Sequence, residues 1–277
     1  MKYILLLLFA LPVVAAETPR AGYLGFDRND YPGDSQLHAL RQSFSYAGYW
    51  LNNPPGSKAN SWKGKRQVLQ VSGFGFLVLF NGRTYAEIRT NGNPGKLGAS
   101  DASAAISSAK AEGFPPQTII FLDQEEGGRL LPEQRVYLHA WADGVSAAGF
   151  IAGVYCSGIA AKETSGEAVI TANDIRQNAG GRKIEYWVVN DACPPSPGCT
   201  VAKRGLLPQE SGIGFAEVWQ FAQSPKRPDF ARGCSATYSN DQNCYVEAGS
   251  MANSLSRLPL DLNVATSGDP SHGRNRD

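Results

Sequence analysis

One stretch of the sequence decides the fold: Thr118-Ile119-Ile120-Phe121-Leu122-Asp123-Gln124-Glu125-Glu126-Gly127-Gly128. Its first five residues are β-branched, aromatic or aliphatic, which is typical of a buried strand. Three acids and two glycines follow. Because side chains alternate along a strand, we expect Asp123 and Glu125 on one side and Gln124 on the other. An isolated Asp-x-Glu would equally fit a solvated loop, so the rest of the chain has to decide between the two interpretations.

Seven further apolar segments have the composition of strands and alternate with helix-like segments or loops. They cover residues 22–27, 46–51, 74–80, 151–156, 184–189, 216–222 and 258–264. Helices are predicted at 35–44, between 98 and 113, from 132 to about 148, and from 173 to 180. No phosphate-binding G-x-G-x-x-G or G-x-x-x-x-G-K-S/T motif occurs, which disfavours a doubly wound nucleotide fold. The pattern predicts one α/β domain over residues 17–264, an irregular (β/α)8 TIM-type barrel with long loops after its sixth and seventh strands.

The two ends of the chain differ from this pattern. Lys2, an apolar run from Ile4 to Val14 and a small-residue site ending at Ala16 predict a cleaved signal peptide, residues 1–16. The apolar run is too short to span a membrane, so the protein is predicted to be secreted or periplasmic. Residues 265–277 are polar and are predicted to form a disordered tail.

Charge narrows the choice of partner. The chain has 26 basic and 25 acidic residues, and loss of Lys2 with the signal peptide leaves no net charge. No strong field therefore favours nucleic acid or an anionic lipid surface. A polymeric substrate has to be held by shape, hydrogen bonds and aromatic stacking. We expect a monomer without a cofactor.

Cysteine spacing agrees with export. Two pairs bracket short loops in otherwise irregular segments and predict two disulfides, Cys193–Cys199 and Cys234–Cys244. Cys156 lies in an apolar strand and is predicted to be a buried free thiol. Zinc is a weaker interpretation, because the chain has no C-x-x-C pair and only three histidines.

Acidic residues mark the places where a barrel carries its active site, the C-terminal ends of its strands. Asp27 ends the first strand, Asp123 and Glu125 end the fourth, and Asp261 lies near the end of the eighth. The eighth strand closes on the first, so Asp27 and Asp261 are expected to face Asp123 and Glu125 across the mouth. Burying four carboxylates without a purpose is costly, which favours a functional pocket. Glu126 is expected to face away from it.

Aromatic and amide side chains are the second group of candidates. Tyr155 on the fifth strand and Trp219-Gln220 on the seventh are positioned to contact a sugar, with Tyr49 and Trp187 as further candidates. The alternative is that these aromatic residues belong to the ordinary core.

Together these residues resemble the family 25 glycoside hydrolases, lysozyme-like muramidases with a β/α barrel. The resemblance is closer to related glycoside-hydrolase-like domains of unknown function in secreted bacterial proteins, and it spans residues 22–263. Its motifs are Gly25-Phe26-Asp27, Tyr46-x-Gly48-Tyr49, Asp123-x-Glu125, Gly153-Val154-Tyr155, Trp219-Gln220 and Asp261.

The resemblance implies a role for each acid. Glu125 would be the general acid, and Asp123 would assist the N-acetyl group of the substrate. Asp27 and Asp261 would orient the sugar and tune the acids. A glycosidase needs one carboxyl kept protonated and one kept ionised, and clustered acids separate in pKa. The implied substrate is an N-acetylated glycan, in the first place peptidoglycan.

Other functions remain open from the sequence. A non-catalytic carbohydrate-binding or cell-envelope-binding protein would use the same barrel. A metal-dependent hydrolase or phosphodiesterase would use the acids as ligands, but the scarcity of histidines disfavours it and no metal is expected. Ser157 lacks the G-x-S-x-G elbow of a nucleophile and is predicted to be a turn residue.

Overall fold

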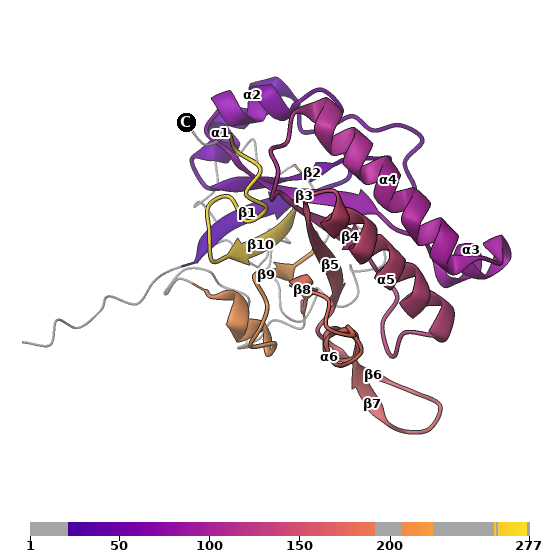
Figure 1. Cartoon of the computed structure of the whole chain (residues 1–277). Helices are drawn as coiled ribbons and strands as arrows, with labels where there is room; N and C mark the ends of the chain where they lie inside the picture. Colours follow the sequence, from indigo (N-terminus) through magenta and orange to yellow (C-terminus); the bar gives the residue numbers. More distant parts are fainter. Residues whose placement is uncertain (1–21, 192–205, 224–257, 259, 276–277) are drawn as a thin grey trace, which may run out of the picture.

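A closed barrel of eight strands forms the centre of the protein (Figure 1). The computed structural model describes residues 22–191, 206–223, 258 and 260–275. Around the barrel the strands follow the order β1-β10-β9-β8-β5-β4-β3-β2. Their bounds are β1 Tyr23–Asp27, β2 Tyr46–Trp50, β3 Gly75–Asn81, β4 Ile119–Asp123, β5 Ile151–Ser157, β8 Glu185–Val189, β9 Val218–Ala222 and β10 Asp261–Ala265. The predicted α/β barrel with eight strands is confirmed.

The last strand runs against the others. Neighbours from β1 through β9 are parallel, whereas β10 is antiparallel to both β1 and β9. The sequence predicts Asp261 near the end of the eighth strand, and this is wrong, because Asp261 is the first residue of β10. The reversal of β10 nevertheless brings Asp261 to the mouth of the barrel, where it pairs with Asp27.

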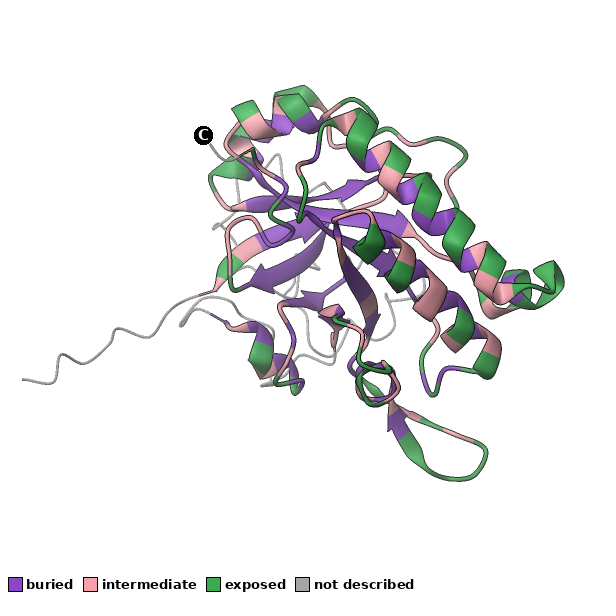
Figure 2. Cartoon of the chain, in the orientation of Figure 1, coloured by how far each residue is buried: buried purple, intermediate pink, exposed green. Residues whose placement is uncertain are grey.

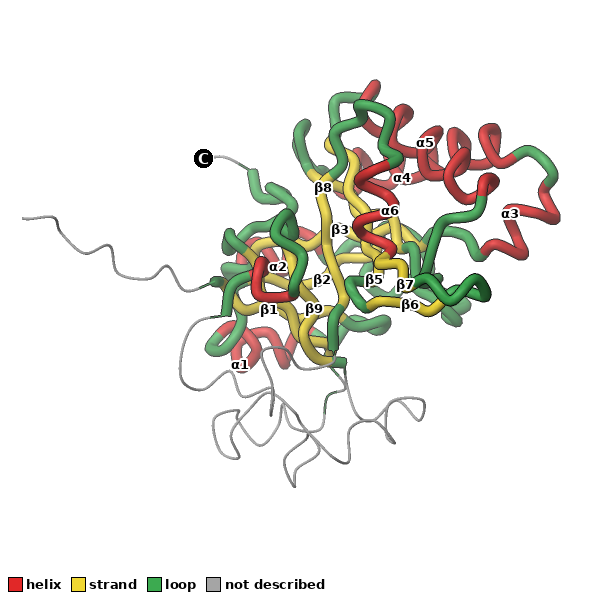
Figure 3. The backbone as a smooth tube through the Cα atoms, turned by 90° about the horizontal axis from the view of Figure 1, so that it is seen from below, coloured by secondary structure: helices red, strands yellow, loops and turns green. Residues whose placement is uncertain are grey.

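Helices cover the outside of the barrel on the side of β2 to β5. Their bounds are α1 Leu37–Arg41, α2 Arg66–Val71, α3 Tyr85–Asn91, α4 Pro94–Glu112, α5 Pro132–Ala147 and α6 Thr171–Gln177, with 3-10 turns η1 Asp34–Gln36 and η2 Pro208–Ser211. Figure 3 shows α3, α4 and α5 together on one side of the strands and α1 on another. Among the described helices none is long and apolar enough to cross a membrane.

Local signals explain the ends of these helices. Pro132 occupies the first position of α5, and Gly113 ends α4 in the left-handed region with φ 81°, both as predicted. Helix α3 is absent from the predicted elements, although the capping box formed by Thr84 and Glu87 marks its start. The short hairpin of β6 (Ala160–Lys162) and β7 (Ala168–Ile170) is also absent from them.

The strands of the barrel are buried, and two glycines leave space for larger side chains in its interior. The strands are buried almost throughout (Figure 2), because side chains fill the barrel and helices cover it. Gly25 and Gly48 are required here. A Cβ on Gly25 would lie 2.1 Å from the ring of Tyr46, and one on Gly48 would lie 2.6 Å from Cβ of Asp27. Glycine at these positions lets Tyr46 and Asp27 share the interior.

Residues 266–275 close the opposite end of the barrel, so the prediction of a disordered tail is wrong for them. Ser271 is fully buried; its N–H donates to the Phe76 carbonyl at 2.9 Å, and its Oγ accepts from the Val78 N–H at 2.8 Å. The Ile119 N–H donates to the Ser271 carbonyl at 2.8 Å. The polar composition that predicts disorder supplies the acceptors for N–H groups at the starts of β3 and β4.

Replacing Ser271 with alanine tests this closure. The Ser271→Ala variant leaves the buried N–H of Val78 without an acceptor, so we expect the free energy of unfolding to fall by about 1–3 kcal/mol. Denaturant unfolding followed by circular dichroism measures the loss. Ser107→Ala, at an exposed position of α4, is the matched control and should change stability by less than about 0.5 kcal/mol. Equal stabilities of the two variants would contradict the assignment.

Candidate functional site

All four acids predicted from the sequence line one cavity at the mouth of the barrel. This cavity, here called the acid pocket, has a volume of about 200 Å³. Its lining residues are Asp27, Asn29, Trp50, Pro55, Leu79, Asp123, Glu125, Tyr155, Trp187, Gln220 and Asp261. They come from β1, β2, β3, β4, β5, β8, β9 and β10 and from the loops that follow. Every strand of the barrel therefore supplies a residue that lines this pocket.

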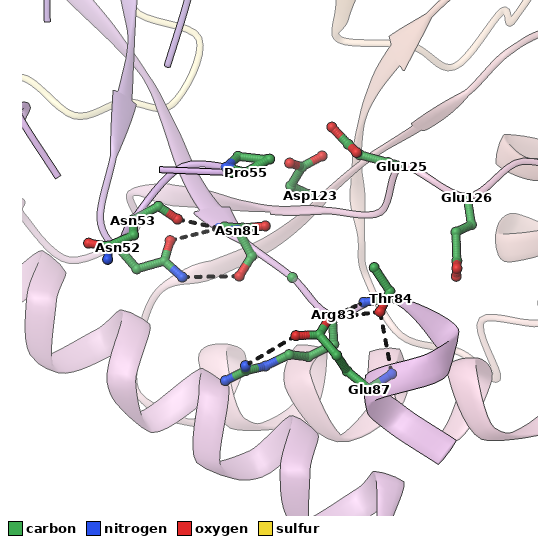
Figure 4. Close-up of a pocket in the computed structure, with 12 residues that line it drawn as sticks. Asn52, Asn53, Pro55, Asn81, Arg83, Thr84, Glu87, Asp123, Glu125 and Glu126 are labelled. Atoms are coloured by element: carbon green, nitrogen blue, oxygen red, sulfur yellow. Dashed lines mark hydrogen bonds and ion pairs between the residues drawn. The ribbon is translucent and has the colours of Figure 1, made fainter. Parts of the chain in front are cut away.

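A second, larger cavity adjoins the acid pocket. This outer cavity has a volume of about 530 Å³ and shares Pro55, Asp123 and Glu125 with the acid pocket (Figure 4). Its other lining residues are Asn52, Asn53, Gly56, Asn81, Gly82, Arg83, Thr84, Glu87 and Glu126. Asp123 and Glu125 thus stand at the boundary between the two cavities.

Asp27 is held by a network of amide groups. Its Oδ1 accepts hydrogen bonds from Gln220 Nε2 at 3.0 Å and from Asn263 Nδ2 at 2.7 Å. The oxygens of these amides accept from the Tyr155 hydroxyl at 2.7 Å and from Trp187 Nε1 at 2.8 Å. Because phenol and indole donate to the amide oxygens, both amide nitrogens have to face Asp27. The orientation of the carboxylate is therefore fixed by its neighbours.

Asp261 lies beside Asp27 because β10 is antiparallel to β1. The two residues are opposite each other in the register of these strands. Opposite residues of an antiparallel pair direct their side chains to the same face. Arg28 lies near Asp261; burial lowers the pKa of Arg28, and the charges of Asp30 and Asp261 act in the opposite direction.

Asp123 and Glu125 differ in their exposure. The exposed fractions of Asp27, Asp123 and Asp261 are 5%, 7% and 2%, whereas Glu125 is exposed. Strand pairing continues one residue past β4, since the Gln124 N–H donates to the Tyr155 carbonyl at 3.0 Å. Asp123 and Glu125 both line the two cavities, and Gln124 lines neither. This arrangement agrees with the predicted alternation of the three side chains.

Glu126, the residue after Glu125, is bound to two helices through its side chain. Its carboxylate oxygens accept from the Tyr85 N–H at 3.0 and 2.9 Å, at the start of α3. The Gln134 side chain of α5 also donates to this carboxylate. In Figure 4 the Glu126 side chain is directed away from Asp123; Glu126 does not line the acid pocket but does line the outer cavity. Since Gln124 and Glu126 are both held, the position of Glu125 between them is restricted.

Tyr155 lies within the field of all four acids. Burial raises its pKa well above the ordinary value, and the charges of Asp123, Asp27, Asp261 and Glu125 raise it further, in that order. Burial and the charge of Asp27 also raise the pKa of Tyr46. The Tyr155 hydroxyl therefore keeps its proton and acts as a donor to Gln220.

Two predicted contact residues do not reach the acid pocket. Tyr49 is fully buried outside the barrel, and its hydroxyl donates to Glu112 Oε2 of α4 at 2.6 Å. Trp219 is also fully buried, and its Nε1 donates to the Asn190 carbonyl at 3.0 Å. The reason is strand alternation, because Gly48 and Gln220 face the interior and each is next to one of these aromatic residues. Tyr155, Trp187 and Gln220 do line the pocket.

Three residues of the site are missing from the predicted set. Trp50 and Asn29 line the acid pocket, and Asn263 binds Asp27. Alternation offered a signal for two of them, since Trp50 is two residues from Gly48 and Asn263 is two residues from Asp261. The position of Asn29 depends on the loop after β1, for which the sequence pattern has no periodic signal.

The remaining candidates divide into described and undescribed residues. The signal peptide and Cys193, Cys199, Cys234 and Cys244 lie outside the described part of the chain. Cys156 is a buried free thiol, as predicted, and burial raises its pKa. Ser157 makes turn contacts, with its Oγ accepting from the Ile159 N–H at 3.1 Å. Within the described ranges no three His, Cys, Asp or Glu side chains are grouped to hold a metal ion.

Alkaline pH is predicted to leave four tyrosines protonated for as long as the fold persists. Burial is the largest cause that raises the pKa of Tyr46, Tyr49, Tyr137 and Tyr155. Because each folded pKa exceeds the unfolded value of about 10, their contribution to stability is complete below that pH and is lost as the pH rises above it.

Ultraviolet titration of phenolate measures this difference. At about pH 11 the native protein should show fewer ionised tyrosines than the same protein in denaturant, where pKa values return to about 10. Ionisation of Tyr46, Tyr49, Tyr137 and Tyr155 together with the other tyrosines before circular dichroism detects unfolding would contradict the prediction.

Comparison with known proteins shows which family the chain belongs to. A search of curated protein sequences found no significant match. A Bacillus stearothermophilus protein aligns with 16% identity and a TM-score of 0.53, over 88% of this chain and 96% of that one. The Mycobacterium tuberculosis Tat-secreted protein Rv2525c aligns with 14% identity and a TM-score of 0.51, over 91% of this chain and 98% of that one.

A Bacillus anthracis family 25 glycosyl hydrolase aligns with 10% identity and a TM-score of 0.50, over 91% of this chain and 92% of that one. At these identities the solved structures share the fold. The family model described as "Rv2525c-like, glycoside hydrolase-like domain" matches residues 44–194, more than half of the 277-residue chain. The chain therefore belongs to the Rv2525c-like family of glycoside hydrolase-like domains.

Proposed function

We propose that the protein is a secreted glycoside hydrolase that cleaves an N-acetylated glycan, with peptidoglycan as the substrate. One observation carries the proposal: Asp123 and Glu125 share a pocket with Asp27 and Asp261 at the mouth of a glycoside hydrolase-like barrel. Burial of three of these carboxylates is costly for stability and is retained where it serves chemistry.

Each acid has a role that fits its environment. Glu125 is exposed next to the outer cavity, where it can give a proton to the departing oxygen and take one from water. Asp123 is buried at the end of β4, where its carboxylate assists the substrate N-acetyl group. A pair of carboxyl groups in different environments is what glycoside hydrolysis requires.

Asp27 and Asp261 orient the sugar from the opposite wall. The amides of Gln220 and Asn263 fix the carboxylate of Asp27, so it does not have to reorganise when a substrate hydroxyl binds. Removal of either amide would free the Asp27 carboxylate to move and would weaken its hold on the substrate.

Aromatic groups give the acid pocket a surface for a sugar ring. Tyr155 and Trp187 are 4.3 Å apart between ring centroids, and Trp50 lines the same pocket. Aromatic faces stack on the apolar face of a sugar while carboxylates and amides bind its hydroxyl groups. A pocket of about 200 Å³ is small, which favours a single ring at the acids.

Two further observations support export and a cell-wall substrate. The sequence predicts a signal peptide over residues 1–16. Structural neighbours include a protein described as Tat-secreted and a family 25 glycosyl hydrolase. The near-zero net charge fits a substrate that is held by hydrogen bonds and stacking.

Glu125→Gln is predicted to abolish turnover and leave the protein folded. Glutamine keeps the size of the side chain but cannot donate the proton, so we expect activity to fall by at least about 100-fold. Zymography on cell walls and mass spectrometry of digested peptidoglycan measure the loss. The matched control is Glu133→Gln on α5, which lines neither cavity and should keep full activity.

The same assays distinguish catalysis from binding. Turnover by the Glu125→Gln variant at the unaltered rate would refute the assignment of the acid. If the unaltered protein binds cell walls and releases no products, the protein is a carbohydrate-binding member of its family instead.

A further inference from the structure

We propose that a cavity at the rear of the barrel, at the end opposite the acid pocket, binds a small organic anion through its carboxylate or phosphate group. This rear cavity has a volume of about 460 Å³ and is lined by Pro115, Pro116, Gln117, His272, Arg274 and Asn275. It shares no lining residue with the acid pocket or the outer cavity. Binding here would be separate from hydrolysis at the mouth.

Two residues of the rear cavity have an unfavourable backbone conformation. Gln117 and His272 have φ angles of 66° and 54°, and among the described residues they are the only ones other than glycine with positive φ. This left-handed conformation is unfavourable for a residue with a Cβ, and glycine would adopt it without strain. Each position nevertheless carries a polar side chain that lines the cavity. Strained residues of this kind cluster at binding sites.

Hydrogen bonds of the surrounding fold hold both strained residues. The Gln117 N–H and Nε2 donate to the Gly149 carbonyl at 2.8 and 3.0 Å. The His272 N–H donates to the Asp269 carbonyl at 2.9 Å, and its neighbours Ser271 and Gly273 are buried. The cavity is therefore formed before a ligand binds, which lowers the entropic cost of binding.

Arg274 carries the positive charge of the rear cavity. Its backbone N–H donates to Asp269 Oδ2 at 2.9 Å, and Nη1 donates to the Phe74 carbonyl at 3.0 Å. These bonds leave Nε and Nη2 without an acceptor in the part of the chain that the structure describes. Nε and Nη2 form one edge of the guanidinium, and its two parallel N–H groups match the two oxygens of a carboxylate or phosphate.

Three other side chains of the cavity offer donors. Asn275 Oδ1 accepts from Arg66 Nη2 at 2.9 Å, so the N–H groups of this amide remain available to a ligand. Gln117 keeps one side-chain N–H, because Nε2 has donated the other. His272 is exposed, and its imidazole makes no hydrogen bond within the described ranges. A set in which donors predominate favours an anion over a cation.

Among the described residues no carboxylate lines the rear cavity. Two acids, Asp269 and Glu112, lie close enough to act on the charge of Arg66. Asp269 accepts from backbone N–H groups, and Glu112 accepts from a tyrosine hydroxyl and a backbone N–H. Arg41 and Arg66 offset these two acids and bind only neutral oxygens themselves. The charge of Arg274 is therefore left for a ligand.

Two prolines give the ligand an apolar surface. Pro115 and Pro116 line the cavity together with the donors. A volume of about 460 Å³ exceeds that of a lone oxyanion and lies in the usual range of small-molecule sites. The ligand is therefore a small organic acid or phosphate ester, whose carbon body contacts the prolines and whose charged group binds Arg274.

Titration of the full chain with two probes tests the site. Inorganic phosphate and succinate are added at constant ionic strength, and NMR follows the Nε–H of Arg274 and the backbone amides of Gln117 and His272. We expect shifts that saturate with at least one probe, and the probe that binds more tightly identifies the charged group. Sodium chloride should cause no saturating shift.

Variants of Arg274 test the guanidinium edge. Arg274→Gln should lower the affinity for the probe at least about tenfold, because it removes both the charge and the paired donors. Arg274→Lys keeps the charge without the paired N–H groups and should also bind more weakly. Arg89→Gln is the matched control, since Arg89 is exposed on α3 and does not line the rear cavity; its affinity should be unaltered. Circular dichroism verifies that each variant is folded.

His272→Gly separates a role in binding from a role in stability. Glycine adopts a φ of 54° without strain, so the melting temperature should not fall. The affinity for the probe should fall by at least about threefold, because the imidazole donor is lost.

Three results would overturn the site. The first is the absence of a saturating shift with either probe. The second is equal affinity of the unaltered protein and the Arg274→Gln variant. The third is an unaltered affinity of His272→Gly together with a lower melting temperature, which would make the strained backbone purely structural. Cell-wall digestion bears on none of these results, so the proposed hydrolase function stands or fails separately.

Discussion

The antiparallel pairing of β10 between β1 and β9 is the contact on which both ends of the barrel depend. It closes the barrel and places Asp261 opposite Asp27 at the mouth. Two residues further along β10, Asn263 reaches the same carboxylate. Because β10 runs away from the mouth, the chain emerges at the other end, where residues 266–275 satisfy the first N–H groups of β3 and β4. A parallel strand would have left both the acids and this closure incomplete.

The acidic mouth combines buried carboxylates with a rigid neutral surrounding. Asp27 is bound by amides whose own oxygens are occupied, so the network has one arrangement. The loop that carries Glu125 is fastened on both sides of that residue, at the Gln124 backbone and at the Glu126 carboxylate. Fixed groups lose little entropy when a ligand binds, which favours precise placement of that ligand.

The composition of the sequence predicts most of the fold. Buried strands require runs of apolar residues, so the positions of these runs locate the strands along the chain. It also predicts the acids at strand ends. The direction of β10 is different, since an apolar run is compatible with either direction and tertiary pairing decides. Tyr49 and Trp219 show a second limit: aromatic residues fit the interior and the outer face equally well. A strict count of alternation from Gly48 and Gln220 would have assigned both to the outside. The same count from Gly48 and Asp261 would have assigned Trp50 and Asn263 to the site.

The closure formed by residues 266–275 places the last described residues at the end of the barrel opposite the acid pocket. The last described residues lie against the ends of the strands remote from the acids, with Arg66 Nη2 donating to the Gly273 carbonyl at 2.7 Å and to Asn275 Oδ1 at 2.9 Å. A tag, a surface linker or a fused domain attached beyond this segment would leave from the rear of the barrel. Immobilised in that way, the protein would keep its acid pocket open to solvent, whereas a partner attached near the β4–α5 loop would stand beside the entrance to that pocket.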